Sequence, residues 1–200
     1  MAGGFYKTPG IEVIILYPSG KVSDLQEKQL TTLGENITAV EIEGTFDDCQ
    51  ALVKEAFLDS ELNKKYHLSS ANSINIARLI PQSFYYFEAY KQVKKIGKEI
   101  VFSVPSGNFG NLTAGLMAKR MGLPVKRFIA ATNINKIVPE YLSSGIYNPK
   151  PSQATISNAM DVGNPSNFVR ILDLYNKDFV AISKDVSGFW LNDNETKEAM

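Results

Sequence analysis

The chain has 200 residues, a length that suits one domain or two small domains that pack closely. Lysine plus arginine and aspartate plus glutamate number 21 each, so no charge excess favours nucleic acid or an anionic membrane as a partner. A single cysteine, Cys49, excludes an internal disulfide framework. Apolar runs such as Val13–Tyr17 are too short to span a bilayer, and no apolar signal core precedes them. We therefore expect a soluble cytoplasmic protein.

The first third of the sequence alternates strand and helix patterns. Short apolar or alternating runs predict strands, and we expect the first of these strands to be buried on both faces. Capping-box residues precede both helical stretches. In chain order we expect a strand over Ile11–Tyr17, a helix from Ser23 to about Leu33, a strand over Ile37–Ile42 and a helix over Phe46–Leu58. This order favours a parallel sheet with right-handed crossovers.

The rest of the chain continues the alternation after a polar stretch, Leu68–Asn75. A helical pattern resumes around Ile76–Leu79, and we expect Pro81 to break or kink it. The further predictions are helices over Ser83–Ile96, Leu112–Met121 and Lys136–Ser143, strands over Glu99–Val104 and Arg127–Thr132, a long loop over Gly145–Ala159, and a helix capped by Asn164 with Pro165 at its first position. The fold class is α/β, with mostly parallel open sheets flanked by helices.

Both ends of the sequence predict incomplete structure. Asn192–Glu195 is typical of a helix start, yet the chain stops at Met200, and so short a helix is not stable without a partner. The N-terminus lies close to a strand with no preceding element. We therefore expect a fragment of a longer chain.

The segment Ser106–Asn111, SGNFGN, lies between a predicted buried strand and a helix. Its two glycines let the backbone approach a ligand closely, and N–H groups at a helix N-terminus suit a phosphate. The side chains of Ser106, Asn108 and Asn111 can add donors. Asn133 and Asn135 follow the next strand and face the same crevice. The alternative is a glycine turn that only closes a strand–helix corner.

The composition of this turn limits which class of anion we expect it to bind. It contains no lysine, unlike a nucleoside-triphosphate P-loop, and it is shorter than the dinucleotide fingerprint. We therefore expect a single phosphate monoester. The only histidine, His67, has no partners at metal-ligand spacing, so we expect no metal site.

Several collinear segments resemble one family over essentially the whole chain. VPSGNFGN, AGLMAKRMGLP, FIAATNIN and TISNAMDVGNPSNFVR resemble the threonine synthases, pyridoxal-phosphate (PLP) enzymes of the β-family with fold type II. Upstream, ILYPSGKVSDLQEKQLTTLG, GTFDDCQALVKEAF and LSSANSINIARLIPQ follow in the family's order. The resemblance implies that residues 1–95 are part of the smaller α/β domain, with a substrate loop at 68–78, and residues 96–200 part of the larger PLP-binding domain.

The resemblance implies roles for two groups of residues. The glycine–asparagine turn would bind the 5′-phosphate of pyridoxal 5′-phosphate through Gly107, Asn108, Phe109, Gly110 and Asn111. In the substrate loop, Ser73 and Arg78 would hold the phosphate of O-phosphohomoserine, with Asn72 and Asn75 nearby. The alternative for the loop is that Asn and Ser side chains cap a helix at Ile76 while Arg78 forms a surface ion pair.

The family's lysine that binds the cofactor covalently has no match in these residues. It would lie upstream of Met1, as would an SGDTG-type loop, and the residue that meets the pyridine nitrogen would lie downstream of Met200. We therefore expect no catalytic residue in this chain, which resembles about the middle half of a threonine synthase and would be inactive alone.

The activity implied is that of a carbon–oxygen lyase. It converts O-phospho-L-homoserine and water to L-threonine and phosphate by γ-elimination and β-hydration. The alternatives are a non-catalytic α/β module that binds a phosphorylated metabolite and another β-family enzyme such as a dehydratase.

Overall fold

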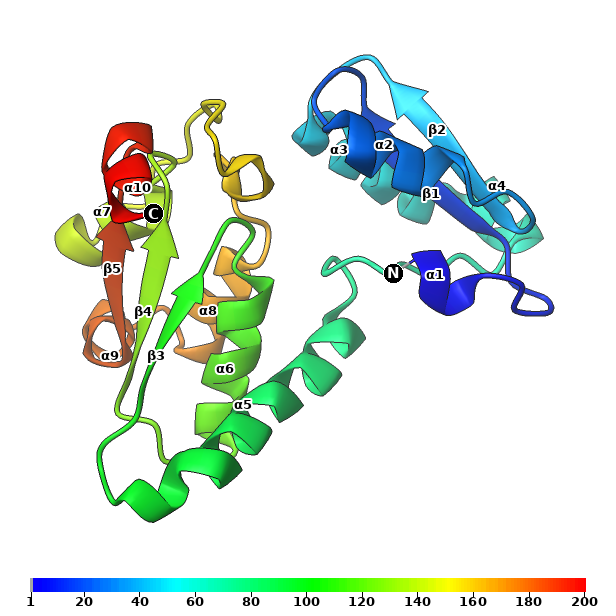
Figure 1. Ribbon diagram of the computed structural model, residues 1–200. Coiled ribbons are helices and arrows are strands. Elements are labelled where there is room, and N and C mark those ends of the chain that lie inside the picture. The colour runs from blue at the N-terminus through cyan, green and yellow to red at the C-terminus, as the bar shows by residue number, and fades with distance from the viewer. Residues whose placement is uncertain (1) are drawn as a thin grey trace. The chain divides into compact units, whose positions relative to one another are not determined.

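A computed structural model describes residues 2–200, which divide into two compact units with the boundary between Ser69 and Ser70 (Figure 1). Among these residues, no helix combines the length and the apolar character that crossing a bilayer requires.

The first unit contains a two-stranded parallel sheet, β1 (Val13–Pro18) and β2 (Ile37–Ile42), paired in register from Val13 opposite Ile37 onward. Capping boxes begin the helices that follow each strand, as predicted, because Ser23 pairs with Gln26 and Thr45 with Asp48. The helices are α1 (Ala2–Phe5), α2 (Asp24–Thr31), α3 (Phe46–Leu58) and α4 (Ser60–Lys65).

Strand β1 is not buried on both faces, contrary to the prediction. The side chain of Ile14 is 71% exposed, whereas Tyr17 near the end of the strand is buried. Successive side chains of a strand point to opposite faces, and α3 packs along this strand, so one set of side chains is covered better than the other. The apolar run alone could not reveal that difference.

The second unit contains a three-stranded parallel sheet in the order β3 (Val101–Pro105), β4 (Arg127–Thr132) and β5 (Val186–Trp190) (Figure 1). The sheet confirms the parallel α/β fold class. Alternating positions such as Phe128 and Ala130 are fully buried. The main helices are α5 (Leu79–Val93), α6 (Gly110–Arg120), α7 (Ile137–Ser144), α8 (Phe168–Leu174), α9 (Phe179–Asp185) and α10 (Asp193–Ala199), with short 3-10 helices at Ile76–Arg78, Lys94–Ile96 and Asn158–Met160.

Helix α5 packs closely on α6 and on the sheet of the second unit. The ring of Tyr86 lies edge-on to Phe102 at 5.0 Å and to Phe128 at 5.6 Å between centroids. Gly115 makes this approach possible, because a Cβ added there would lie 2.6 Å from Phe128 and 2.7 Å from Tyr86. Residues 70–95 are therefore part of the second compact unit, which begins at Ser70, and the domain boundary expected at 95/96 stays a prediction.

Several predicted boundaries differ in the structure. Pro81 does not break a helix, because it lies in the first turn of α5, where its missing N–H has no helical partner to lose. Asn164 does not cap a helix: its side chain accepts a hydrogen bond from Tyr147, and α8 begins at Phe168. Helix α9 and strand β5 were not predicted. The helix start at Asn192 is confirmed.

Candidate functional site

The glycine–asparagine turn connects the carboxyl end of β3 to the start of α6. Ser106 still donates its N–H to the carbonyl of Ala131, so the sheet holds the entry to the turn. Phe109 adopts a left-handed conformation with φ 62°, which costs free energy in a residue other than glycine. Its buried ring packs against Phe168 with 6.3 Å between centroids, so packing stabilises the bend.

The backbone of this turn offers a row of unused donors. Within the described part of the chain, the N–H groups of residues 107–111 have no hydrogen-bond acceptor. Consecutive N–H groups around a left-handed residue form a concave anion site, and the helix dipole adds positive potential at the same place. Such a row of donors is compatible with a phosphate group, and the binding of the cofactor phosphate at this turn stays a prediction.

The two glycines of the turn allow close contact with other segments. A Cβ added at Gly107 would lie 2.8 Å from the Cα of Met160, so only glycine fits against that backbone. A Cβ added at Gly110 would lie 3.4 Å from Ser73 Cβ, which is an ordinary contact. Gly107 is therefore the more demanding position.

The oxygen atoms of the side chains predicted to add donors are engaged within the protein. The Oγ of Ser106 donates to the carbonyl of Val104 at 2.9 Å. The Oδ1 of Asn108 accepts from the N–H and the hydroxyl of Ser166. The Oδ1 of Asn111 accepts from the Tyr86 hydroxyl at 2.9 Å. Because this contact uses Oδ1 as the acceptor, Asn111 Nδ2 can still donate to an anion beside the backbone N–H groups.

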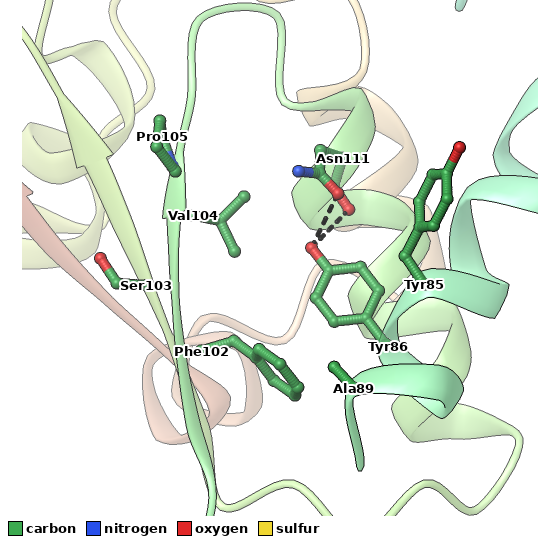
Figure 2. A pocket seen from close by; sticks show the side chains of 8 residues that line it. All are labelled: Tyr85, Tyr86, Ala89, Phe102, Ser103, Val104, Pro105 and Asn111. Carbon is green, nitrogen blue, oxygen red and sulfur yellow. Dashed lines mark hydrogen bonds between the residues drawn. The ribbon is translucent and has the colours of Figure 1, made fainter. Parts of the chain in front are cut away.

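A cavity of about 350 Å³ lies between α5 and β3, and the hydrogen-bonded side chains of Tyr86 and Asn111 are part of its lining (Figure 2). Aromatic and aliphatic side chains dominate its lining, and no charged side chain is among them. Such a lining does not suit a phosphate group. The residues that line it are Tyr85, Tyr86, Ala89, Phe102, Ser103, Val104, Pro105 and Asn111.

The predicted substrate loop lies against the turn. The Oγ of Ser73 accepts a hydrogen bond from Asn167 Nδ2 at 3.0 Å and a longer one from Asn108 Nδ2 at 3.4 Å. Ser73 is half-buried at this junction. The structure thus brings together the two candidate sites that the sequence placed in different domains.

The other predicted loop residues shape the loop itself. Asn75 caps the 3-10 helix at Ile76–Arg78 by accepting from the N–H of Ala77 at 3.0 Å, which confirms the capping alternative for this residue. Asn72 Oδ1 accepts from the N–H of Ser73 at 2.6 Å. The guanidinium of Arg78 donates to the carbonyl of Ala71 at 2.8 Å. The substrate-binding roles of these side chains stay predictions.

Sequence reasoning missed Asn167 and Arg170, which connect the loop to the turn. Asn167 is fully buried, and its Nδ2 also donates to the carbonyl of Asn108 at 3.0 Å. Arg170 donates to the carbonyls of Ser73 and Ile74 and to Asn167 Oδ1. Burial lowers the pKa of Arg170, which nevertheless stays protonated. Both residues lie in a segment that showed the family resemblance, but no local signal marks a partner 97 positions away.

Asn133 and Asn135 are buried and hold the loop that covers the turn. Both side-chain amides donate to Asp161 Oδ1, at 2.8 and 3.2 Å respectively. The same carboxylate accepts from the N–H and the hydroxyl of Thr155. This network fixes the segment that carries Met160, which meets Gly107.

Comparisons with known proteins identify the family. The family model described as "Pyridoxal-phosphate dependent enzyme" matches residues 7–188. Threonine synthase of Escherichia coli is 53% identical over 201 residues, covering 100% of this chain and 47% of that protein. The crystal structure of threonine synthase from E. coli matches with a TM-score of 0.92 at 50% identity, covering 100% of this chain and 46% of that one. The PLP-bound threonine synthase from Brucella melitensis matches with a TM-score of 0.82 at 36% identity, covering 98% and 47%.

The chain spans about half the length of the curated relatives that it matches. Its parallel sheets and flanking helices are those of fold type II PLP enzymes. The family's cofactor is pyridoxal 5′-phosphate, which agrees with the anion site at residues 107–111. Because the family model covers most of the sequence, the chain belongs to the pyridoxal-phosphate dependent enzymes.

Proposed function

We propose that this chain is part of a threonine synthase, which converts O-phospho-L-homoserine and water to L-threonine and phosphate. The observation that carries the proposal is the contact between Ser73 of the substrate loop and Asn108 of the phosphate-binding turn. The identity to E. coli threonine synthase supports the same assignment.

The N–H groups of Gly107, Asn108, Phe109, Gly110 and Asn111 would hold the 5′-phosphate of PLP. Their donors are already oriented, so little reorganisation accompanies binding. The bound cofactor supplies an electron sink that makes the carbon–hydrogen bonds next to the substrate's amino group acidic.

The substrate phosphate would bind at the loop, through the Ser73 hydroxyl and the Arg78 guanidinium. A guanidinium matches the oxygens of a phosphate and balances its charge, which also favours phosphate as the leaving group. Asn72 and Asn75 would act indirectly, since their side chains hold the loop's backbone.

The covalent anchor for the cofactor would come from outside these residues. We infer that residues 70–200 form part of the PLP-binding domain and residues 2–69 part of the smaller domain. Residues 70–78 of the substrate loop would then belong to the same compact unit as the turn. The isolated chain would have no turnover, because no lysine here matches the family's motif.

The test uses the full-length protein that contains this chain, loaded with PLP. Incubation with O-phosphohomoserine should release inorganic phosphate and L-threonine in equal amounts. Release of ammonia from threonine, without phosphate release from O-phosphohomoserine, would favour a dehydratase and refute the proposal. Failure of the protein to acquire the visible absorption of bound PLP would refute the cofactor assignment as well.

A further inference from the structure

We propose that Arg170 and Asn167 are positioning residues that clamp the substrate loop onto the cofactor turn and leave the Ser73 hydroxyl available only as a hydrogen-bond donor. The clamp is defined by the contacts of these two side chains with Ser73, Ile74 and Asn108. The inference rests on the proposed function for its substrate, but its structural part can be tested separately.

Arg170 fixes the backbone of the loop. Its guanidinium donates to the carbonyls of Ser73 and Ile74, two successive residues, and to Asn167 Oδ1. A planar guanidinium spans such a set of acceptors, whereas the ammonium of a lysine is a point charge without the fork geometry. The half-buried position makes these charge-assisted hydrogen bonds less accessible to competing water. The loop therefore has a defined position relative to α8.

Asn167 connects that fixed loop to the turn. Because its Oδ1 accepts from Arg170, the orientation of its amide is determined and its NH₂ group must face Ser73 and Asn108. The two hydrogens of Nδ2 serve the Ser73 hydroxyl and the Asn108 carbonyl, each at 3.0 Å. The side chain is fully buried, so its polar atoms depend on these partners.

The contacts of the Ser73 hydroxyl determine its chemistry. A hydroxyl has two lone pairs and one hydrogen. Asn167 and Asn108 both donate to Ser73 Oγ, which uses the two lone pairs. The remaining hydrogen is directed to Asn72 Oδ1 over a long 3.3 Å contact, which a phosphate oxygen can replace. The clamp thus prepares a donor for an anion.

The clamp also implies that the two sites influence each other. Asn108 contributes its backbone carbonyl to Asn167 and its N–H group to the proposed cofactor site. A cofactor phosphate that orders the turn therefore orders the acceptor of Asn167, and an ordered loop favours cofactor binding to the same degree.

The test compares Arg170→Met with Arg127→Met in the full-length PLP-loaded protein. Arg127 is a matched control because its guanidinium also donates to two backbone carbonyls, those of Lys184 and Ser183. We expect Arg170→Met to accelerate amide hydrogen exchange in residues 70–78 about tenfold or more, since charge-assisted hydrogen bonds are lost. Arg127→Met should leave exchange in that segment unchanged. Unchanged exchange at residues 70–78 in Arg170→Met would overturn the clamp.

A second variant, Asn167→Asp, tests the donor role of Ser73 if Arg170→Met fails to fold. Asn167→Asp preserves the shape and gives Arg170 a carboxylate partner, but it removes the donor that faces Ser73. The Ser73 hydroxyl should then donate to the new carboxylate, so the KM for O-phosphohomoserine should rise about tenfold or more, as expected when a hydrogen bond to a charged phosphate is lost. An unchanged KM would overturn the donor role of Ser73.

The two proposals fail in distinguishable ways. A wild-type protein that releases no phosphate from O-phosphohomoserine contradicts the proposed function, whereas loop exchange in Arg170→Met still decides the clamp. Conversely, normal turnover with unchanged loop exchange contradicts the clamp alone. Addition of PLP should slow exchange at residues 70–78 in the wild type and less so in Arg170→Met; equal slowing in both would contradict the coupling.

Discussion

Substitution of Gly107 by alanine tests the turn most directly. The added Cβ would lie 2.8 Å from the Cα of Met160 and 3.2 Å from the carbonyl oxygen of Ala159. Both neighbours are backbone atoms, so no side-chain rotation can relieve the contact. Gly110→Ala is the matched control in the same turn, because its nearest contacts lie at 3.4 Å.

The free-energy cost of Gly107→Ala depends on which of the two contacting segments moves. The covering loop is held by Asp161, which accepts hydrogen bonds from Asn133, Asn135 and Thr155, so we expect the turn to move. Overpacking of this kind costs about 1–3 kcal/mol. Separately, loss of one N–H contact to the cofactor phosphate should weaken PLP binding by about 1.5–3 kcal/mol, which corresponds to a rise of about 10- to 150-fold in the Kd for PLP.

The assay is a titration of the full-length apoprotein with PLP, followed by absorbance, together with urea unfolding of each variant. Gly107→Ala should lower both stability and PLP affinity, whereas Gly110→Ala should unfold within about 0.5 kcal/mol of the wild type. A Gly107→Ala protein with wild-type PLP affinity would refute the close-approach reasoning. Equal destabilisation by both substitutions would show that the contact with Met160 is not the cause.

Three further predictions concern other parts of the chain. Gly115→Ala would place a Cβ 2.7 Å from the Tyr86 ring and should lower the free energy of unfolding in urea by about 1–3 kcal/mol; a loss under about 0.5 kcal/mol would contradict the packing. Arg78→Ala should raise the KM for O-phosphohomoserine, because substrate binding should weaken by about 2–5 kcal/mol. The affinity for PLP, measured by titration, should stay unchanged, and a wild-type KM would exclude Arg78 from the substrate site. The hydroxyl and N–H of Thr45 lower the pKa of Asp48, so its stabilising effect is present above the unfolded pKa and lost as pH falls through the folded pKa. Asp48→Asn should therefore destabilise at neutral pH, with a difference from wild type that shrinks in acid unfolding titrations; a constant difference would contradict this assignment.

Local chemistry in the sequence determined many elements of this protein. The strands Ile37–Ile42 and Arg127–Thr132 and the helix Phe46–Leu58 have the bounds that their patterns predict, because capping and alternation depend on neighbouring residues. The turn at Gly107–Asn111 likewise lies between a strand and a helix as its glycines predict, and its free N–H groups agree with the predicted anion site.

Only the tertiary structure decided how distant segments complete the site. The placement of α5 in the second unit depends on the contact of Gly115 with Tyr86, and the clamp depends on Arg170 meeting Ser73 97 residues away. No periodicity or cap encodes such contacts, because they form only when the sheet and its helices have packed. The sequence by itself therefore determined the glycine–asparagine turn between β3 and α6, whereas tertiary packing determined that the proposed substrate loop lies against this turn and which side chains hold it there.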